Sequence, residues 1–164
     1  MKVDYAACVQ KIRAMPLFKK VVILLGKWLP LVVILVYIIT ALFLLITENR
    51  KIWMFLAIPA LCLVSVTILR NAINRMRPYD AMGYLPLLSK KSGAGKSFPS
   101  RHTASAWVIA SACCFLSPLY GGIMFVVALL VGTSRVLAGV HYLSDVLVGA
   151  GFALLCSLLF FLPV

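Results

Sequence analysis

Residues 132–145 read GTSRVLAGVHYLSD and place an arginine, a histidine and an aspartate between two strongly apolar segments. His141 and Asp145 are four residues apart, so on a helix they lie one turn from each other on the same face. A carboxylate there can bind one imidazole nitrogen and leave the other free and basic. Arg135 lies six residues before His141, and Gly139 between them lets the chain bend. The stretch is therefore a candidate site with a cation, a nucleophile or base and an orienting acid, although it also fits an ordinary polar loop between two helices.

The composition of the whole chain is that of an integral membrane protein. Hydrophobic residues make up 63% of its 164 residues, whereas only about half of a soluble domain is apolar. Sixteen Lys and Arg residues against four Asp and Glu give a net charge of +12. Such a charge suits anionic lipid headgroups or phosphate substrates, and the apolar spans argue against a nucleic-acid partner. The length predicts a single domain over residues 1–164.

The order of apolar and polar segments predicts an all-α fold, a polytopic bundle of about five transmembrane helices. The predicted spans are residues 21–46, 52–69, 103–117, 123–133 and 146–162. Residues 1–20 combine five basic residues with apolar residues at roughly helical spacing. They predict an amphipathic helix that lies in the membrane interface, with a solvated basic linker as the alternative.

The longest polar stretch, residues 70–101, lies between the second and third spans. It opens with RNAINRMRP, in which Arg70, Asn74 and Arg77 are spaced to share one helical face. Pro78 is expected to end that helix. The two arginines fit an anion clamp, but they also fit end-caps that snorkel to the interface.

Two further segments follow within this polar stretch. Residues 92–97 are expected to form a flexible loop with a charged rim. The sequence FPSRHTASA then begins at residue 98, and Ser100 is a good N-cap for a new helix. The free N–H groups at the start of that helix would form an anion site near His102.

Counting membrane crossings places three charged clusters on the same side of the membrane. They are residues 70–77, 99–102 and 134–145, and they include both histidines of the protein. An accidental distribution of charged residues is not expected to converge in this way. The convergence favours a functional site over three unrelated polar loops.

The three clusters resemble the signature of the type 2 phosphatidic acid phosphatase (PAP2) superfamily, which includes bacterial membrane lipid phosphatases and vanadium haloperoxidases. The family pattern is Lys-x6-Arg-Pro, then Pro-Ser-Gly-His, then Ser-Arg-x5-His-x3-Asp. The matching segments here are Arg70-x6-Arg77-Pro78, Pro99-Ser100-Arg101-His102 and Ser134-Arg135-x5-His141-x3-Asp145. The third motif is complete, whereas Arg replaces Lys at 70 and Gly at 101.

The resemblance implies a hydrolase that uses no metal and no cofactor. It implies that His141 attacks phosphorus to form a phosphohistidine, that Asp145 orients His141, and that His102 protonates the leaving oxygen and then activates water. The residues implied to bind the phosphate oxygens are Arg70, Arg77, Ser100, Arg101 and Arg135. Phosphoryl transfer depends mainly on neutralising these oxygens, which arginines can do without a metal.

The expected function is that of a lipid phosphate or diphosphate phosphatase in the bilayer. Undecaprenyl diphosphate is favoured as substrate, because Arg101 and the lysines of the preceding loop can hold a second phosphate. Phosphatidylglycerophosphate or phosphatidic acid is the alternative. A small channel or assembly protein with a degenerate site is the non-enzyme alternative, and haloperoxidase chemistry fits poorly because those relatives are soluble.

The family analogy places the protein in the bacterial cytoplasmic membrane with the active site on the extracytoplasmic face. The distribution of basic residues favours the opposite orientation, because the other end of the bundle carries only Arg50 and Lys51. An N-terminal helix that lies flat in the interface is not translocated as a loop, so its basic residues weigh less against the orientation that the family analogy gives. The sequence leaves the oligomeric state open.

Overall fold

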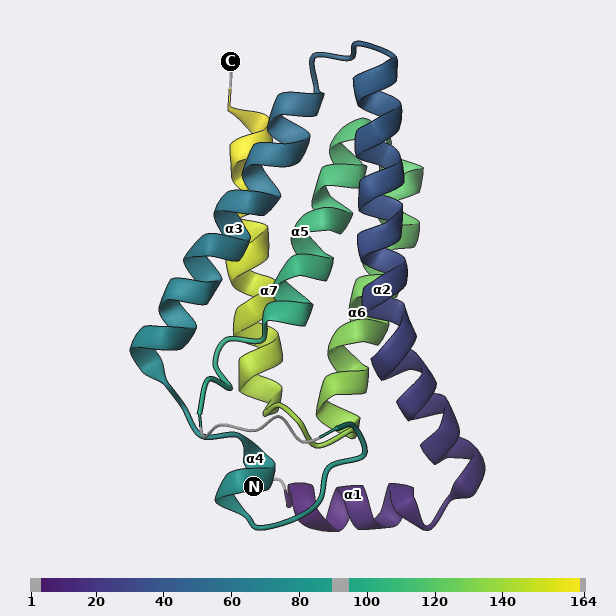
Figure 1. Ribbon diagram of the computed structural model, residues 1–164, viewed down its shortest axis with the longest axis vertical. Coiled ribbons are helices and arrows are strands. Elements are labelled where there is room, and N and C mark those ends of the chain that lie inside the picture. The colour runs from purple at the N-terminus through teal and green to yellow at the C-terminus, as the bar shows by residue number, and fades with distance from the viewer. Residues whose placement is uncertain (1–3, 90–94, 163–164) are drawn as a thin grey trace.

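The computed structural model describes residues 4–89 and 95–162, and the regular structure in that part is entirely helical. The elements are α1 (Tyr5–Arg13), α2 (Pro16–Ile46), α3 (Ile52–Ile73), α4 (Pro78–Ala81), α5 (Arg101–Leu116), α6 (Pro118–Leu137), α7 (Leu143–Ser157) and the 3-10 helix η1 (Leu158–Phe161). Five long helices, α2, α3, α5, α6 and α7, run along the bundle, while α1 and α4 lie at one end (Figure 1).

Four helical segments of the described chain are long and apolar enough to cross a membrane, namely Pro16–Ile46, Ile52–Ala81, Pro118–Leu137 and Leu143–Phe161. They correspond to the first, second, fourth and fifth predicted spans. The third predicted span corresponds to α5, which has 16 residues and is not among the four. Its contacts with α3, α6 and α7 bury most of its small side chains. Small side chains of this kind let neighbouring helices approach closely inside a membrane bundle.

The N-terminal helix is shorter than predicted. The prediction placed one helix over residues 1–20, whereas α1 ends at Arg13 and Pro16 begins α2. Proline is favoured in the first helical turn because no intrahelical N–H is needed there. The location of α1 in the membrane interface stays a prediction.

The apolar face of α1 is buried against the protein. Tyr5, Val9 and Ile12 are buried, and the Tyr5 hydroxyl accepts a hydrogen bond from the Leu143 N–H at 3.0 Å. A Cβ atom at Gly139 would lie 2.6 Å from Val9. α1 therefore supports the turn between α6 and α7.

The end of α3 also differs from the prediction. Asn74 adopts the left-handed conformation (φ 44°) and terminates α3 after Ile73, a role for which asparagine is suited. The prediction that Arg70, Asn74 and Arg77 share one helical face is therefore wrong. Pro78 does not end this helix but begins α4.

The start of α5 and the start of α7 are in direct contact. The Ser100 N–H donates to the Asp145 carbonyl oxygen at 2.9 Å. A Cβ atom at Gly149 would lie 2.9 Å from the Ser100 carbonyl oxygen, so only glycine permits this approach. The contact brings the second and third predicted motifs together.

Candidate active site

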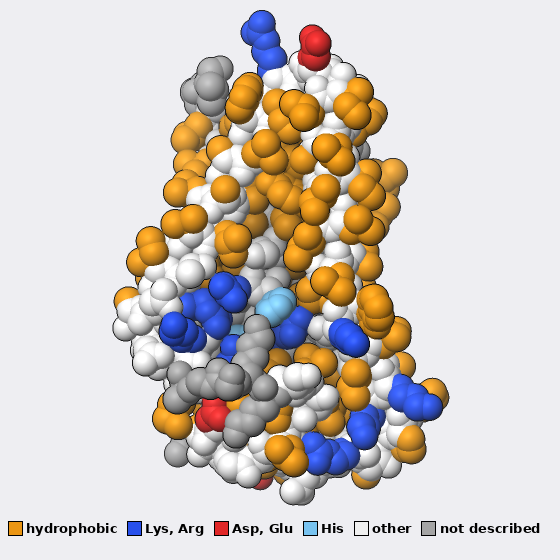
Figure 2. All heavy atoms as spheres, viewed as in Figure 1, with side chains coloured by type: hydrophobic (Ala, Val, Ile, Leu, Met, Phe, Trp, Pro, Cys, Tyr) orange, Lys and Arg blue, Asp and Glu red, His pale blue; other side chains and the backbone are white. Residues whose placement is uncertain are grey.

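The three predicted motifs meet at the end of the bundle where α1 and α4 lie. Figure 2 shows Lys and Arg side chains gathered around a histidine near this end, below a face that is otherwise mostly apolar. The buried polar and charged residues at this end include Arg70, Arg77, Ser97, Ser100, Arg135, His141 and Asp145. Burial of so many polar groups in one place is costly unless they bind each other or a ligand.

His141 and Asp145 form the predicted pair. Nδ1 of His141 lies 3.3 Å from Oδ2 of Asp145, and the carboxylate is fully buried. His141 precedes α7 rather than lying on it, whereas Asp145 lies in the first turn and accepts the Tyr142 N–H at 3.0 Å. A carboxylate acceptor at Nδ1 requires that this nitrogen carries the proton, which leaves Nε2 as the basic nitrogen.

The electrostatic surroundings keep His141 neutral. Burial is the main cause that lowers the pKa of His141 from 6.5 to about 4. The positive charges of Arg77 and Arg70 lower it further, while the hydrogen bond and charge of Asp145 oppose the change. At neutral pH the imidazole is therefore uncharged, the state that a nucleophile requires.

Two residues of the site were missed by the sequence prediction. Nη1 of Arg75 donates to Oδ1 of Asp145 at 2.9 Å and to the Ser144 hydroxyl at 2.9 Å. The Ser97 hydroxyl donates to Oδ2 of Asp145 at 2.5 Å and lies 3.4 Å from Nδ1 of His141. Ser97 is fully buried, so the prediction of a flexible loop over residues 92–97 is wrong at this position, and residues 90–94 lie outside the described part.

The arginines of the three motifs differ in how they are held. Arg70 donates to the backbone carbonyls of Lys96, Ser97 and Pro99, the last at 2.6 Å. Arg77 is buried, and its Nη1 lies 3.5 Å from the Val140 carbonyl oxygen. Arg70 thus anchors the segment before α5, and phosphate binding by both residues stays a prediction.

Arg135 reaches from α6 to the first long helix. Its Nη2 donates to the Gly26 carbonyl oxygen in α2 at 2.7 Å. Its Nε is buried and has no hydrogen-bond partner among the described residues. An unpaired buried donor on a cation is the group that an anionic ligand would satisfy.

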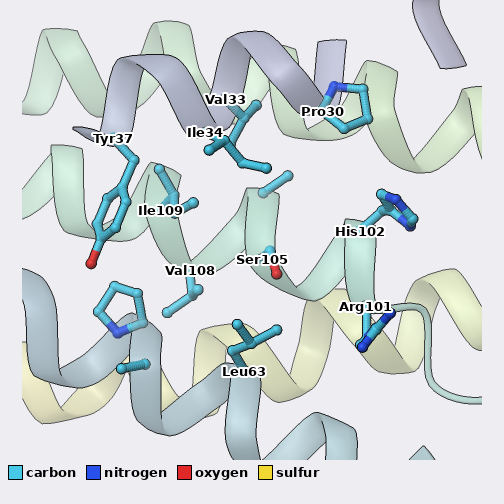
Figure 3. A pocket seen from close by; sticks show the side chains of 13 residues that line it. Pro30, Val33, Ile34, Tyr37, Leu63, Arg101, His102, Ser105, Val108 and Ile109 are labelled. Atoms are coloured by element: carbon cyan, nitrogen blue, oxygen red, sulfur yellow. The ribbon is translucent and has the colours of Figure 1, made fainter. Parts of the chain in front are cut away.

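The residues at the start of α5 lie on two sides of the site. Ser100 is the N-cap residue, as predicted, but its fully buried hydroxyl accepts from the Thr103 hydroxyl at 3.0 Å and does not cap the backbone. Arg101 is exposed and His102 is half-buried. Both line one end of a cavity of about 540 Å³ between α2, α3 and α5 (Figure 3).

This cavity is apolar along most of its length. In Figure 3 Arg101 and His102 lie at one end and Tyr37 lies at the other. The walls between them include Val33 and Ile34 of α2, Leu63 of α3 and Val108 of α5. The cavity thus joins a hydrocarbon-lined space to the cationic end of the bundle.

The described residues contain no group of three or more His, Cys, Asp or Glu side chains placed to hold a metal ion. Carboxylate-rich sites of the kind that magnesium prefers require several such ligands. That the reaction needs no metal and no cofactor stays a prediction.

Comparison with known proteins gives a family match over most of the chain. Residues 31–163 match the model of the PAP2 superfamily. The lipid A 1-phosphatase of Rhizobium johnstonii is 34% identical over 97 residues, which are 56% of this chain and 39% of that protein. The matched segment therefore spans about two fifths of the length of this curated relative.

Two solved structures resemble the bundle. The crystal structure of LpxE from Aquifex aeolicus has a TM-score of 0.67 and 28% sequence identity, covering 90% of this chain and 86% of that one. A transmembrane PAP2 type phosphatidylglycerolphosphate phosphatase from Bacillus subtilis has a TM-score of 0.53 and 26% identity, covering 95% and 90% of the two chains.

Proposed function

Because the chain belongs to the PAP2 superfamily, we propose that this integral membrane protein is a lipid phosphate phosphatase that works through a phosphohistidine on His141. The observation that carries the proposal is the pairing of a buried, neutral His141 with Asp145 beside Arg70 and Arg77. A non-catalytic channel or assembly protein would have no need of a nucleophile held in this way.

The chemistry follows from the positions of the side chains. Nε2 of His141 attacks phosphorus while Asp145 holds the Nδ1–H and stabilises the positive charge that develops on the ring. The arginines neutralise the oxygens of the transferred phosphoryl group. His102 donates a proton to the leaving oxygen, then takes one from the water that cleaves the phosphohistidine and releases inorganic phosphate.

The apolar cavity supports a lipid as the leaving group. His102 and Arg101 line the cavity end nearest to the cationic cluster, so a leaving oxygen beside His102 places its hydrocarbon chain among the apolar walls. α2 and α3 meet at their far ends and diverge towards this end (Figure 1). Because residues of both α2 and α3 line the cavity, a lipid ester can enter it from the bilayer without crossing water.

We favour a polyprenyl diphosphate, such as undecaprenyl diphosphate, as the substrate. When His141 attacks the terminal phosphorus, the leaving group is the lipid-linked phosphate. Arg101 lies next to His102 at the cavity mouth, where it can bind that second phosphate. Phosphatidylglycerophosphate and phosphatidic acid are the alternatives, and the relatives named lipid A 1-phosphatase add lipid A 1-phosphate.

The proposed topology has five crossings, with α5 as the third. α5 runs beside the other long helices for most of the bundle (Figure 1), although it is shorter than the four apolar candidates. We place the protein in the bacterial cytoplasmic membrane with the His141 end on the extracytoplasmic face.

The test is an assay of the purified protein in detergent, in excess EDTA, with these lipid phosphates and diphosphates offered one at a time. The expected result is release of inorganic phosphate, fastest from the polyprenyl diphosphate, inhibition by orthovanadate and no release by His141→Ala. Vanadate should inhibit because it adopts the five-coordinate geometry of the transition state. No release from any of them would contradict the proposal, and loss of activity in EDTA that magnesium restores would contradict the metal-free mechanism.

A further inference from the structure

Two prolines lie inside the long helices and each one frees a backbone carbonyl. Pro30 is inside α2 and Pro59 is inside α3. Proline has no N–H, so the carbonyl four residues earlier loses its usual intrahelical donor. These carbonyls belong to Gly26 and Phe55. In an apolar environment such a group needs another donor.

In both cases a side chain of another helix supplies that donor. Tyr37 of α2 donates its hydroxyl to the Phe55 carbonyl oxygen at 3.2 Å. Arg135 of α6 donates Nη2 to the Gly26 carbonyl oxygen at 2.7 Å. Both bonds link two helices, and the second one also fixes a cation of the candidate site.

The bond to Gly26 sets the orientation of the Arg135 guanidinium. This group is planar and carries five N–H donors in fixed directions, so one anchored nitrogen restricts where the others point. Nη2 is the anchored nitrogen, and the buried Nε has no partner among the described residues. The anchored guanidinium of Arg135 thus keeps its Nε–H available to donate to an anion.

Local packing supports the close approach of α2. Gly26 is buried, and a Cβ atom at this position would lie 2.8 Å from Cδ1 of Leu88. Gly26 and Pro30 both precede the family match, which begins at residue 31. The carbonyl that holds Arg135 therefore comes from outside the matched region.

We propose that Pro30 is a positioning residue for phosphate binding, because it releases the Gly26 carbonyl that holds Arg135 in place. The inference rests on the proposed function only in assigning the anion as a substrate phosphate. With alanine at position 30, the restored N–H competes for the Gly26 carbonyl and the straighter helix withdraws that carbonyl from Arg135.

Thermal stability separates this role from a structural one. Alanine is more favourable than proline in a helix interior, so Pro30→Ala is expected to keep or raise the melting temperature. A simple packing role would instead predict that activity and stability fall together. Activity that falls without loss of stability excludes a simple packing role. Because Pro30 also lines the cavity between α2, α3 and α5, a double-mutant cycle is needed to assign the loss to Arg135.

The experiment is a double-mutant cycle of Pro30→Ala with Arg135→Ala in detergent. Pro30→Ala should lower kcat/KM by about tenfold, the effect of one hydrogen bond to a charged group, and weaken orthovanadate inhibition by a similar factor. In the Arg135→Ala background it should cause no further loss. Pro59→Ala is the matched control, since it also removes a helical proline but its effect should multiply with that of Arg135→Ala.

An unchanged kcat/KM in Pro30→Ala, or a loss that multiplies with that of Arg135→Ala, would overturn the inference. If Pro30→Ala does not fold, Pro30→Gly restores the same N–H and takes its place. A wild-type protein without lipid phosphatase activity would refute the proposed function alone. The vanadate-induced shift in melting temperature then tests the inference without turnover, and equal shifts in wild type and Pro30→Ala would refute it.

Discussion

The Asp145 carboxylate accepts hydrogen bonds from three separate parts of the described chain. Arg75 contacts one oxygen, and Ser97, His141 and the Tyr142 N–H contact the other. The sequence predicted the contact with His141 by placing both residues on one helical face, whereas His141 precedes α7 and reaches Asp145 from the turn before that helix. It did not predict the contacts of Arg75 or Ser97. On a continuous helix Arg75 would lie on a different face from Arg70 and Arg77, but the left-handed Asn74 ends α3 just before it.

Arg75 is expected to affect the pKa of His141, because its positive charge partly neutralises the Asp145 carboxylate. In Arg75→Gln the carboxylate is less neutralised, so its field raises the pKa of His141. The acid limb of the kcat profile should move up by on the order of 1 pH unit, and kcat should fall about tenfold. A pH–rate series measures both. Arg50→Gln, the same change at the opposite end of the bundle, is the control, and an identical acid limb in wild type and Arg75→Gln would exclude this role.

Stability should depend on pH through His141. Its pKa is 6.5 when unfolded and about 4 when folded, so between these values the unfolded chain binds the additional proton. Stability therefore rises with pH across this window and is lost as pH falls from 6.5 towards 4. Melting temperatures in detergent should show this loss in wild type and a smaller one in His141→Asn. Equal losses in the two proteins would mean that the folded pKa of His141 is not lowered.

At the scale of the helices, hydropathy predicted the positions of the long segments but not the residues at which the helices near the site end. α3 ends at a left-handed Asn74, and α1 packs on the turn before α7 instead of extending to residue 20. Both outcomes depend on tertiary contacts that a periodic pattern does not contain. The predicted N-cap at Ser100 was confirmed in position because a polar residue before an apolar run is a local signal.

The contact between α5 and α7 is expected to be sensitive to a single methyl group. Gly149→Ala places a Cβ 2.9 Å from the Ser100 carbonyl oxygen, and backbone does not yield as a flexible side chain does. The variant should lose about 1–3 kcal/mol of stability and most of its activity, because the two motifs are forced apart. Gly151→Ala is the matched control, since a Cβ there meets nothing within 4 Å. Indistinguishable melting temperatures and rates for these variants would contradict the close contact.

At the scale of the whole molecule, the two ends of the bundle differ in chemistry. α1 and α4 lie at one end and the turn between α2 and α3 lies at the other (Figure 1). The buried arginines Arg70, Arg77 and Arg135 belong to the end with α1 and α4. The all-α class and the convergence of the motifs followed from the sequence, because membrane segments alternate in direction. Which end faces the cytoplasm did not follow, because the basic residues and the family analogy point in opposite directions.

Cys8 offers a direct measurement of this orientation. It is the exposed one of the five cysteines and lies in α1 at the active end. A thiol reagent that does not cross membranes should label it in intact spheroplasts if this end is extracytoplasmic. A cysteine introduced by Arg50→Cys in a Cys8→Ser background should react only after permeabilisation. The reverse pattern would place the active site in the cytoplasm.

In the proposed mechanism His141 carries the phosphoryl group during turnover. Rapid acid-free quenching of enzyme mixed with a lipid substrate labelled at its terminal phosphate measures this directly. We expect an acid-labile label on His141 in wild type, more of it in His102→Ala because hydrolysis of the phosphohistidine is slowed, and none in His141→Ala. Turnover of the labelled lipid by His141→Ala, or absence of protein-bound label in His102→Ala while its first turnover proceeds, would exclude a phosphohistidine on His141.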